Sequence, residues 1–256
     1  MICAGLVSVT FRQLSPAVII GLVQRAGLKA IEWGGDIHVP YGDIARAREV
    51  RRATEDAGLR VAAYGSYYRV GHEEPGPFQT ALETAVALGA PAIRVWAGKL
   101  WSHEADAAYW GRVVEDSRRI ADLAADAGVN VAYEFHGRTL TDTNESARAL
   151  LQAAAHPNIK TYWQPPQGST VQYNLAGLEA IAPWLLNINV FYWRREEADP
   201  PRIVRLPLAD GDTAWRQYLR RIADIGRDHY ALLEFVRDDA TEAFLQDVTA
   251  FRQWLT

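Results

Sequence analysis

The sequence has one cysteine, one methionine and only three lysines among its 27 basic residues. A lone Cys3 excludes an intramolecular disulfide, so nothing in the chain requires an oxidising compartment. No apolar run approaches a length of about 18 residues, the minimum for a transmembrane helix. The first residues have no basic leading segment and reach Arg12 too soon to resemble a secretory signal. These absences predict a cytoplasmic protein with no membrane partner.

The chain also lacks a strong charge of one sign. Its 31 acidic and 27 basic residues give a net charge of −4, which offers no overall attraction for a phosphate backbone, so no nucleic-acid partner is expected. Neither a P-loop nor a GxGxxG dinucleotide motif is present. With 49% hydrophobic and 23% charged residues, the composition is that of a globular protein that buries one substantial core. The one excess is tryptophan, with nine residues.

One pattern recurs eight times along the chain: a short β-rich run, a turn, and an amphipathic helical stretch. The expected strands are Ile2–Thr10, Ala30–Gly34, Val61–Tyr67, Ala92–Trp96, Val129–Phe135, Ile159–Gln164, Leu186–Phe191 and Ala231–Val236. The expected helices are Ser15–Ala26, Gly42–Ala57, Pro77–Leu88, Ala105–Ala127, one capped by Asn144, Leu175–Pro183, Ala214–Ile225 and Thr241–Leu255. At this length the alternation predicts a closed (β/α)₈ TIM barrel in one domain, residues 1–256, with an open doubly wound sheet as the alternative.

Two segments interrupt this regularity. The stretch from Trp193 to Thr213 shows no helical pattern, and long loops of this kind are functional lids or interface segments. It is therefore a candidate lid or homodimer contact, although the sequence leaves the oligomeric state open. A second loop, Gly71–Gly76, follows the third strand.

Polar residues at the carboxyl ends of the strands are the candidate site, because TIM-barrel active sites form there. Glu134 and Glu234 each lie within an apolar strand, where an unpaired charge would cost several kcal/mol. Alternation places His136 on the same face as Glu134, toward the barrel mouth. Two carboxylates across a cavity are suited to moving a proton on and off a substrate carbon, or to gripping a divalent ion. The alternative is a plain ion pair with an inward Arg94.

Further candidates for substrate binding surround these carboxylates. Glu32 lies near the end of the second strand and His38 in the loop after it, while Lys99 follows the fourth strand, where it is a weaker candidate for contact with a phosphate. Four tryptophans at or past strand ends are expected to wall the pocket, since indole rings stack on sugars and donate hydrogen bonds: Trp33, Trp96, Trp101 and Trp193. By alternation, Trp163 is expected to face the helices instead.

Four short motifs resemble one known family. YEFH at 133–136, LLEF at 232–235, IEWGG at 31–35 and ADGDTAW at 209–215 are similar to the xylose isomerase-like TIM barrels, the sugar phosphate isomerases and epimerases. The resemblance covers essentially the whole chain. It implies the barrel fold, while the family includes ketose epimerases, inosose dehydratases and AP endonucleases.

The resemblance also implies a metal site that this chain alters. Typical members bind Mn²⁺, Mg²⁺ or Co²⁺ through Glu, Asp, His and Glu from strands five to eight, and use the two Glu as acid and base. Glu134 and Glu234 match these two, whereas the Asp position holds Gln164 and the strand-seven His position holds Asn189. Gln167 stands at a further His position, and Arg195 matches a frequent Arg.

An all-oxygen set of Glu134, Gln164, Asn189 and Glu234 would favour Mg²⁺ or Mn²⁺ over softer ions. Alternatively, no metal binds and the two amides contact substrate hydroxyls. The leading hypothesis is an isomerase or epimerase of a small ketose, polyol or related carbohydrate, with Glu134 and Glu234 moving a proton beside a carbonyl and Arg195 holding a substrate oxygen or phosphate. A dehydratase or lyase on a similar substrate is the alternative. From other classes, a non-catalytic sugar-binding barrel is the second hypothesis, and a nucleic-acid hydrolase is a distant third.

Overall fold

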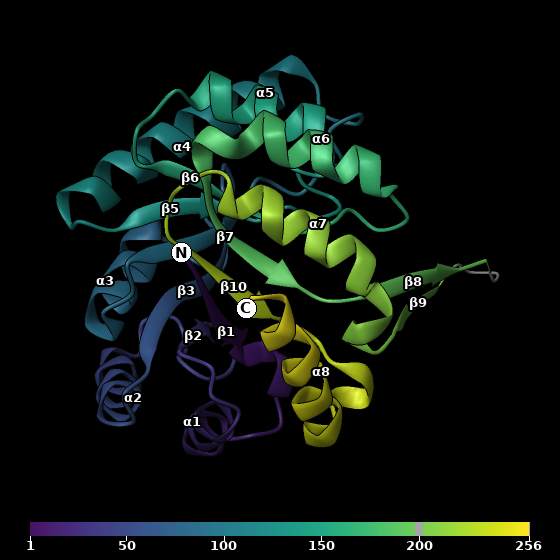
Figure 1. Cartoon of the computed structure of the whole chain (residues 1–256). Coiled ribbons are helices and arrows are strands. Elements are labelled where there is room, and N and C mark those ends of the chain that lie inside the picture. The colour runs from purple at the N-terminus through teal and green to yellow at the C-terminus, as the bar shows by residue number, and fades with distance from the viewer. Residues whose placement is uncertain (198–201, 256) are drawn as a thin grey trace.

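A computed structural model of the protein describes residues 1–197 and 202–255. Eight strands form a closed barrel (Figure 1): β1 (Ile2–Val7), β2 (Ala30–Gly34), β3 (Arg60–Arg69), β4 (Ala92–Trp96), β5 (Asn130–Tyr133), β6 (Ile159–Trp163), β7 (Leu185–Val190) and β10 (His229–Leu233). The helices are α1 (Pro16–Arg25), α2 (Ile44–Asp56), α3 (Phe78–Leu88), α4 (Ala107–Asp126), α5 (Asn144–Ala154), α6 (Val171–Ile181), α7 (Asp212–Ala223) and α8 (Thr241–Trp254). The (β/α)₈ prediction is confirmed.

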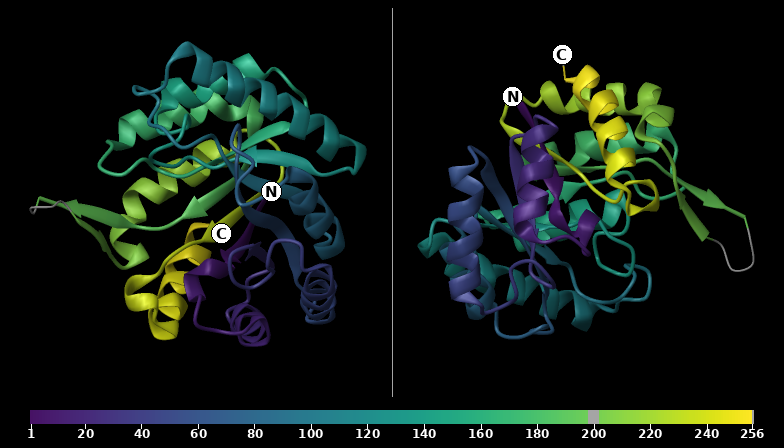
Figure 2. Two further views of the ribbon diagram at one scale, coloured as in Figure 1. Left: turned by 180° about the vertical axis from the view of Figure 1, so that it is seen from behind. Right: turned by 90° about the horizontal axis from the view of Figure 1, so that it is seen from below.

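Every pairing within the barrel is parallel, and the strands follow the order β1-β10-β7-β6-β5-β4-β3-β2. The first and last strands close the barrel, with pairs running from Ile2–His229 to Leu6–Leu233. The helices cover the outside of the barrel, as the views from behind and below show (Figure 2). All strands therefore point their carboxyl ends toward one mouth, where a TIM barrel carries its active site.

Side chains alternate between two apolar cores. Small residues such as Ala30, Ala92 and Ala132 pack inside the barrel together with Tyr162. Leucine, isoleucine and most aromatic side chains, Trp163 among them as expected, pack between the strands and the surrounding helices. Small inward side chains leave room for longer polar ones near the mouth.

The first and third strands end at other residues than expected. β1 ends at Val7, three residues before the expected Thr10, because Ser8–Phe11 turn into a 3₁₀ helix. β3 instead extends to Arg69 through a bulge between Gly65 and Tyr68. Bulges re-aim side chains and recur next to active sites.

The stretch expected to be a long loop contains an antiparallel hairpin, β8 (Trp193–Glu196) and β9 (Arg202–Arg205), so the prediction of a structureless segment is wrong. The hairpin extends away from the barrel beside α7 (Figures 1 and 2). A short 3₁₀ helix, Leu208–Gly211, follows it. Cross-strand pairs such as Arg202 with Glu196, whose atoms lie 2.8 Å apart, hold the two strands together.

Helix boundaries agree with the predicted ones to within a few residues. α6 begins four residues early at Val171, and the cap of α5 is Thr143, whose hydroxyl accepts from Ser146 N, so the assignment of Asn144 as the cap is wrong. Asn144 is the first helical residue and donates to the carbonyl of Tyr173. No helix within the described residues has the length and hydropathy needed to cross a bilayer.

Candidate active site

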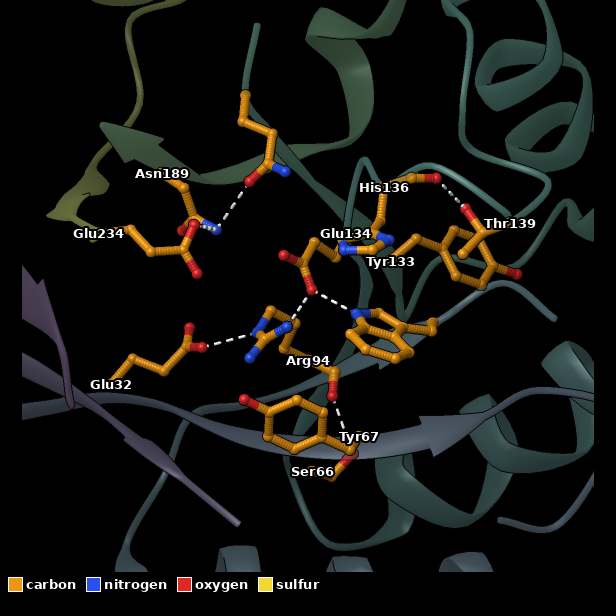
Figure 3. Close-up of polar contacts among 12 residues, drawn as sticks. Glu32, Ser66, Tyr67, Arg94, Tyr133, Glu134, His136, Thr139, Asn189 and Glu234 are labelled. Atoms are coloured by element: carbon orange, nitrogen blue, oxygen red, sulfur yellow. Dashed lines mark hydrogen bonds and ion pairs between the residues drawn. The ribbon is translucent and has the colours of Figure 1, made fainter. Parts of the chain in front are cut away.

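Arg94 is the centre of the charged groups in the barrel mouth. Its guanidinium is 2% exposed and donates through Nε to Glu32 Oε1 at 2.7 Å and through Nη1 to Glu134 Oε2. Figure 3 shows the arginine between the two carboxylates. Burial alone would lower the pKa of Arg94, but the charges of Glu134 and Glu32 hold it well above its usual value.

This network of Arg94, Glu32 and Glu134 forms because strand alternation points the three side chains inward. It also needs the glycine that β3 places beside the guanidinium. A Cβ at Gly65 would lie 2.8 Å from Arg94 Nη2 and 3.0 Å from Glu32 Oε1. Only the missing side chain leaves space for the ion pair. The ion pair that the sequence offered as an alternative for the carboxylates is thus present for Glu134, and it includes Glu32.

Glu134 follows β5 and is held by its backbone as well as its side chain. Its amide donates to Val95 O at 3.0 Å, and Thr141 Oγ1 donates to its carbonyl at 2.5 Å. Its Oε2 accepts from Arg94 and from the indole Nε1 of Trp96. Its other oxygen accepts no hydrogen bond from the described residues, which leaves it open to a substrate.

Glu234 stands in a different environment. It follows β10, is 5% exposed, and has no cationic hydrogen-bond partner among the described residues. Burial, together with the nearby charge of Glu134, raises its pKa from 4.5 to about 8 despite the opposing influence of Arg94. Glu234 is therefore protonated at neutral pH, while Glu134 accepts two hydrogen bonds as a carboxylate.

The two amides at the altered metal positions contact each other and Glu234. Asn189 Nδ2 donates to Gln164 Oε1 at 3.0 Å and to Glu234 Oε2 at 3.3 Å (Figure 3). Asn189 Oδ1 is buried without any hydrogen-bond partner. An orphaned buried amide oxygen on a residue that contacts Glu234 fits a hard cation, so the set of Glu134, Gln164, Asn189 and Glu234 is compatible with Mg²⁺ or Mn²⁺. No group of three or more His, Cys, Asp or Glu that could hold a metal ion occurs among the described residues.

Below these groups, Tyr162 forms the floor of the site. Its hydroxyl accepts from Asn187 Nδ2 at 2.8 Å, and burial together with the charge of Glu32 raises its pKa far above the usual value. Burial also raises the pKa of Glu32, although Arg94 opposes the shift, and Glu32 Oε2 has no hydrogen-bond partner. Tyr162 was missed by sequence reasoning, although its inward position follows from the alternation that turns Trp163 outward.

Aromatic rings line one side of the mouth. Trp96 stacks on His136 with centroids 4.8 Å apart and meets Tyr67 edge-on at 5.4 Å. Tyr67 also lies under Arg94, 5.3 Å from ring centroid to guanidinium carbon, and its φ of 58° reflects the bulge of β3. The structure thus places Trp96 and His136 at the mouth, as expected, and brings in Tyr67 from the strand before.

Two other candidates do not face the mouth. Trp33 is fully buried on the outside of the barrel, where its indole donates to Thr54 Oγ1 of α2 at 3.2 Å. Its expected place in the pocket wall is therefore wrong, because a neighbour of inward Glu32 points outward by alternation. His38 is 2% exposed, and both ring nitrogens are engaged, by Ser8 Oγ at 2.9 Å and Leu14 O at 3.2 Å. In the structure the imidazole supports the loop, and its contact with a substrate stays a prediction.

The remaining candidates lie around the rim. Trp101 is 37% exposed and packs over Gly137, next to His136. Gln167, Trp193 and Arg195 line one cavity of 330 Å³. Trp193 stacks on Phe191 with centroids 3.9 Å apart, and its buried indole nitrogen has no partner.

Comparisons with known proteins agree with this architecture. No curated protein is significantly similar to the chain in sequence. Among solved structures, it is similar to the probable 3-DHS dehydratase AsbF of Bacillus anthracis, with a TM-score of 0.79, 20% identity, and coverage of 98% of this chain and 99% of that one. It is also similar to a xylose isomerase-like TIM barrel protein of Mycobacterium smegmatis in complex with magnesium (TM-score 0.71, 17% identity, 96% and 90% covered). A third similar structure is D-psicose 3-epimerase in the presence of D-fructose (TM-score 0.69, 15% identity, 98% of this chain and 97% of that one covered).

At these identities the solved structures show the fold alone. The neighbours named as enzymes include epimerases and a probable dehydratase. The family model described as the xylose isomerase-like TIM barrel matches residues 20–254. With the closed barrel and the resemblance of its strand-end motifs, the chain belongs to the xylose isomerase-like TIM barrel family.

Proposed function

We propose that the protein is an isomerase or epimerase of a small ketose, polyol or related carbohydrate, acting by proton transfer beside a carbonyl. The observation that carries the proposal is the difference between its two carboxyl groups. Glu134 accepts from Arg94 and Trp96 as a carboxylate, whereas Glu234 has a pKa of about 8 and holds a proton at neutral pH. Paired groups whose environments separate their protonation states are the usual sign of an acid and a base.

In this mechanism Glu134 is the base. Its oxygen without a hydrogen bond removes the proton from the carbon beside the carbonyl, and the electron pair moves onto the carbonyl oxygen as an enediolate. Glu234 then delivers its own proton to the opposite face of the same carbon, which inverts that centre. Exchange with solvent returns both groups to their starting states.

If Glu234 gives up its proton, Glu134, Gln164, Asn189 and Glu234 are the residues that would hold Mg²⁺ or Mn²⁺, because a ligating carboxyl is ionised. When bound, such an ion supplies Lewis-acid stabilisation of negative charge on the substrate oxygen. The chain's own donors around this position are the amide of Asn189 and the guanidinium of Arg94. The partly exposed aromatic residues of the mouth, Trp96, Trp101 and Trp193, are proposed to bind the sugar, with Gln167 and Arg195 beside them.

A dehydratase or lyase is the second candidate, because a protonated Glu234 can equally act as the acid that expels a leaving group. If Glu234 gives its proton to a hydroxyl on the next carbon, the C–O bond breaks, water leaves and a double bond forms between the two carbons. The step of Glu134 is the same in both reactions. Substrate geometry therefore decides between them.

The test is solvent-deuterium exchange into a panel of ketoses and inososes, followed by NMR. Deuterium beside the carbonyl is expected with the native protein, and Glu134→Gln or Glu234→Gln abolishes it. Glu115→Gln on α4, at an exposed carboxylate without an ion pair among the described residues, is the matched control. Loss of water from the substrate identifies the dehydratase. Sugar binding without exchange identifies a binding module and refutes the enzyme.

A further inference from the structure

A positively charged cavity adjoins the proposed proton-transfer site. It has a volume of 360 Å³ and is lined by Arg69, Glu74, Trp96, Lys99, His136, Gly137 and Arg138. Three of these residues are cationic and one is anionic. Lys99 and Glu74 form an ion pair with each other, so Arg69 and Arg138 are left facing the cavity without a carboxylate partner among the described residues.

Arg69 is half-buried, and its surroundings do not neutralise it. Its guanidinium carbon lies 4.1 Å from the centroid of the Trp96 ring, and its one hydrogen bond runs from Nη1 to Gly98 O at 3.3 Å. Burial lowers its pKa, and the charge of Glu74 opposes this only in part. A cation desolvated without a counter-charge is stabilised by an anionic ligand.

The backbone fixes Arg69 at this position. The bulge in β3 pairs Arg69 with Trp96 of β4, and the Arg69 amide donates to Glu74 O at 2.8 Å. The next amide, of Val70, donates to Trp96 O at 3.0 Å. The guanidinium therefore extends from a paired strand end over an indole ring, and little entropy is lost when it binds a ligand.

Arg138 approaches the same cavity from the loop after β5. It is exposed and has a φ of 59°, a left-handed conformation that is uncommon outside glycine and asparagine. Thr139 Oγ1, which donates to His136 O at 2.6 Å, anchors this turn (Figure 3). Arg69 at the end of β3 and Arg138 in the loop after β5 thus line one cavity together with the stacked rings of Trp96 and His136.

Trp96 connects this cavity to the proposed chemistry. One edge of its ring donates to Glu134, while its face carries Arg69. We propose that the substrate carries an anionic group, a carboxylate or a phosphate, which Arg69 and Arg138 bind. The ring of Trp96 separates this group from the carbon that exchanges its proton. This inference rests on the proposed function and narrows it from carbohydrates in general to sugar acids or sugar phosphates.

The test uses three ketoses that share one skeleton: neutral D-fructose, its carboxylate counterpart D-fructuronate, and D-fructose 6-phosphate. Calorimetry measures binding of each, and NMR in D₂O measures exchange. At least one anion is expected to bind about tenfold or more tightly than D-fructose, the worth of a charge-assisted hydrogen bond. The preferred anion tells a carboxylate site from a phosphate site.

Variants locate the effect. Arg69→Gln and Arg138→Gln are each expected to weaken binding of the anion about tenfold while leaving D-fructose unchanged, and Arg69→Lys restores part of the loss. Arg148→Gln, at an exposed arginine of α5, is the matched control and leaves all three ligands unaffected. Equal losses for all three ligands in Arg69→Gln would point to a structural role and overturn the proposal.

The remaining outcomes separate this proposal from the proposed function. An anion that binds through Arg69 without deuterium exchange refutes the proton-transfer enzyme and supports the anion site. Deuterium exchange into D-fructose, without tighter binding of either anion, supports the proton-transfer enzyme and refutes the anion site. Failure of both anions to bind overturns the anion site.

Discussion

Replacing Glu234 by glutamine is expected to stabilise the protein at neutral pH while it removes the proposed acid. The unfolded chain ionises this carboxyl near its ordinary pKa of 4.5, whereas burial beside Glu134 raises the folded-state pKa to about 8. Below 4.5 both states are protonated, and the carboxyl does not oppose folding. As the pH rises toward 8, only the unfolded state releases the proton.

The magnitude follows from these two values. Each pH unit between them lowers the free energy of unfolding by about 1.4 kcal/mol. At pH 7 the buried carboxyl therefore lowers that free energy by about 3 kcal/mol relative to a neutral side chain of the same shape, and the loss levels off above pH 8. Glutamine keeps the shape and has no proton to lose.

Urea unfolding at pH 5 and pH 7.5 measures this effect. Glu234→Gln is expected to match the native protein at pH 5 within about 1 kcal/mol and to exceed it by about 4 kcal/mol at pH 7.5. Glu115→Gln, an exposed change on α4, controls for loss of a negative charge and shows no such pH dependence. A difference that is the same at both pH values would refute the assignment of a protonated, buried Glu234.

Three further changes examine the same network. Glu134→Gln is expected to reduce deuterium exchange at least about 100-fold, the usual worth of a general base, and exchange at the native rate would exclude Glu134 as the base. Arg94→Leu leaves the carboxylates of Glu32 and Glu134 buried without a cation. It is expected to lower the free energy of unfolding, measured by urea titration, by about 3 to 5 kcal/mol. A loss below about 1 kcal/mol would contradict the buried ion pair. If the oxygens of Glu134, Gln164, Asn189 and Glu234 hold Mn²⁺, the ion at about 100 times its Kd adds about 2.7 kcal/mol to the free energy of unfolding and raises Tm. A chelator, or the change Asn189→Leu, is expected to remove this rise in Tm. An equal rise in the Asn189 variant would place the ion elsewhere.

Much of the fold was predictable because strands and helices of this chain differ in period and in their end signals. Gly58 and Gly89 end helical patterns, and both adopt the positive φ that helix ends favour. The hairpin was not predictable in the same way, because its strands are rich in arginine and glutamate and are joined by prolines. Charged, two-sided exposed strands carry no alternation of apolar residues for a periodicity argument to detect.

The candidate site was predictable where strand alternation was applied consistently. It places Glu134 and Glu234 at the mouth and Trp163 among the helices, and the same rule turns Trp33 outward once Glu32 is inward. Position along a strand predicts how close a residue lies to the mouth. Only its place in the inward–outward alternation predicts whether its side chain points into the barrel. Tyr67 lies within, and Arg69 just after, a bulge that breaks this alternation, and nothing local in the sequence marks the bulge.

The sharing of one guanidinium by two carboxylates restricts how this site can change in evolution or by design. Replacing Arg94 leaves two buried carboxylates without their cation, and replacing Glu32 or Glu134 removes one of the two carboxylates that pair with the arginine. Gly65 adds a further restriction, since no larger residue fits while the arginine is in place. These positions lie on four different strands, so they are expected to change together or not at all, and a designer altering the chemistry has to replace them as a set.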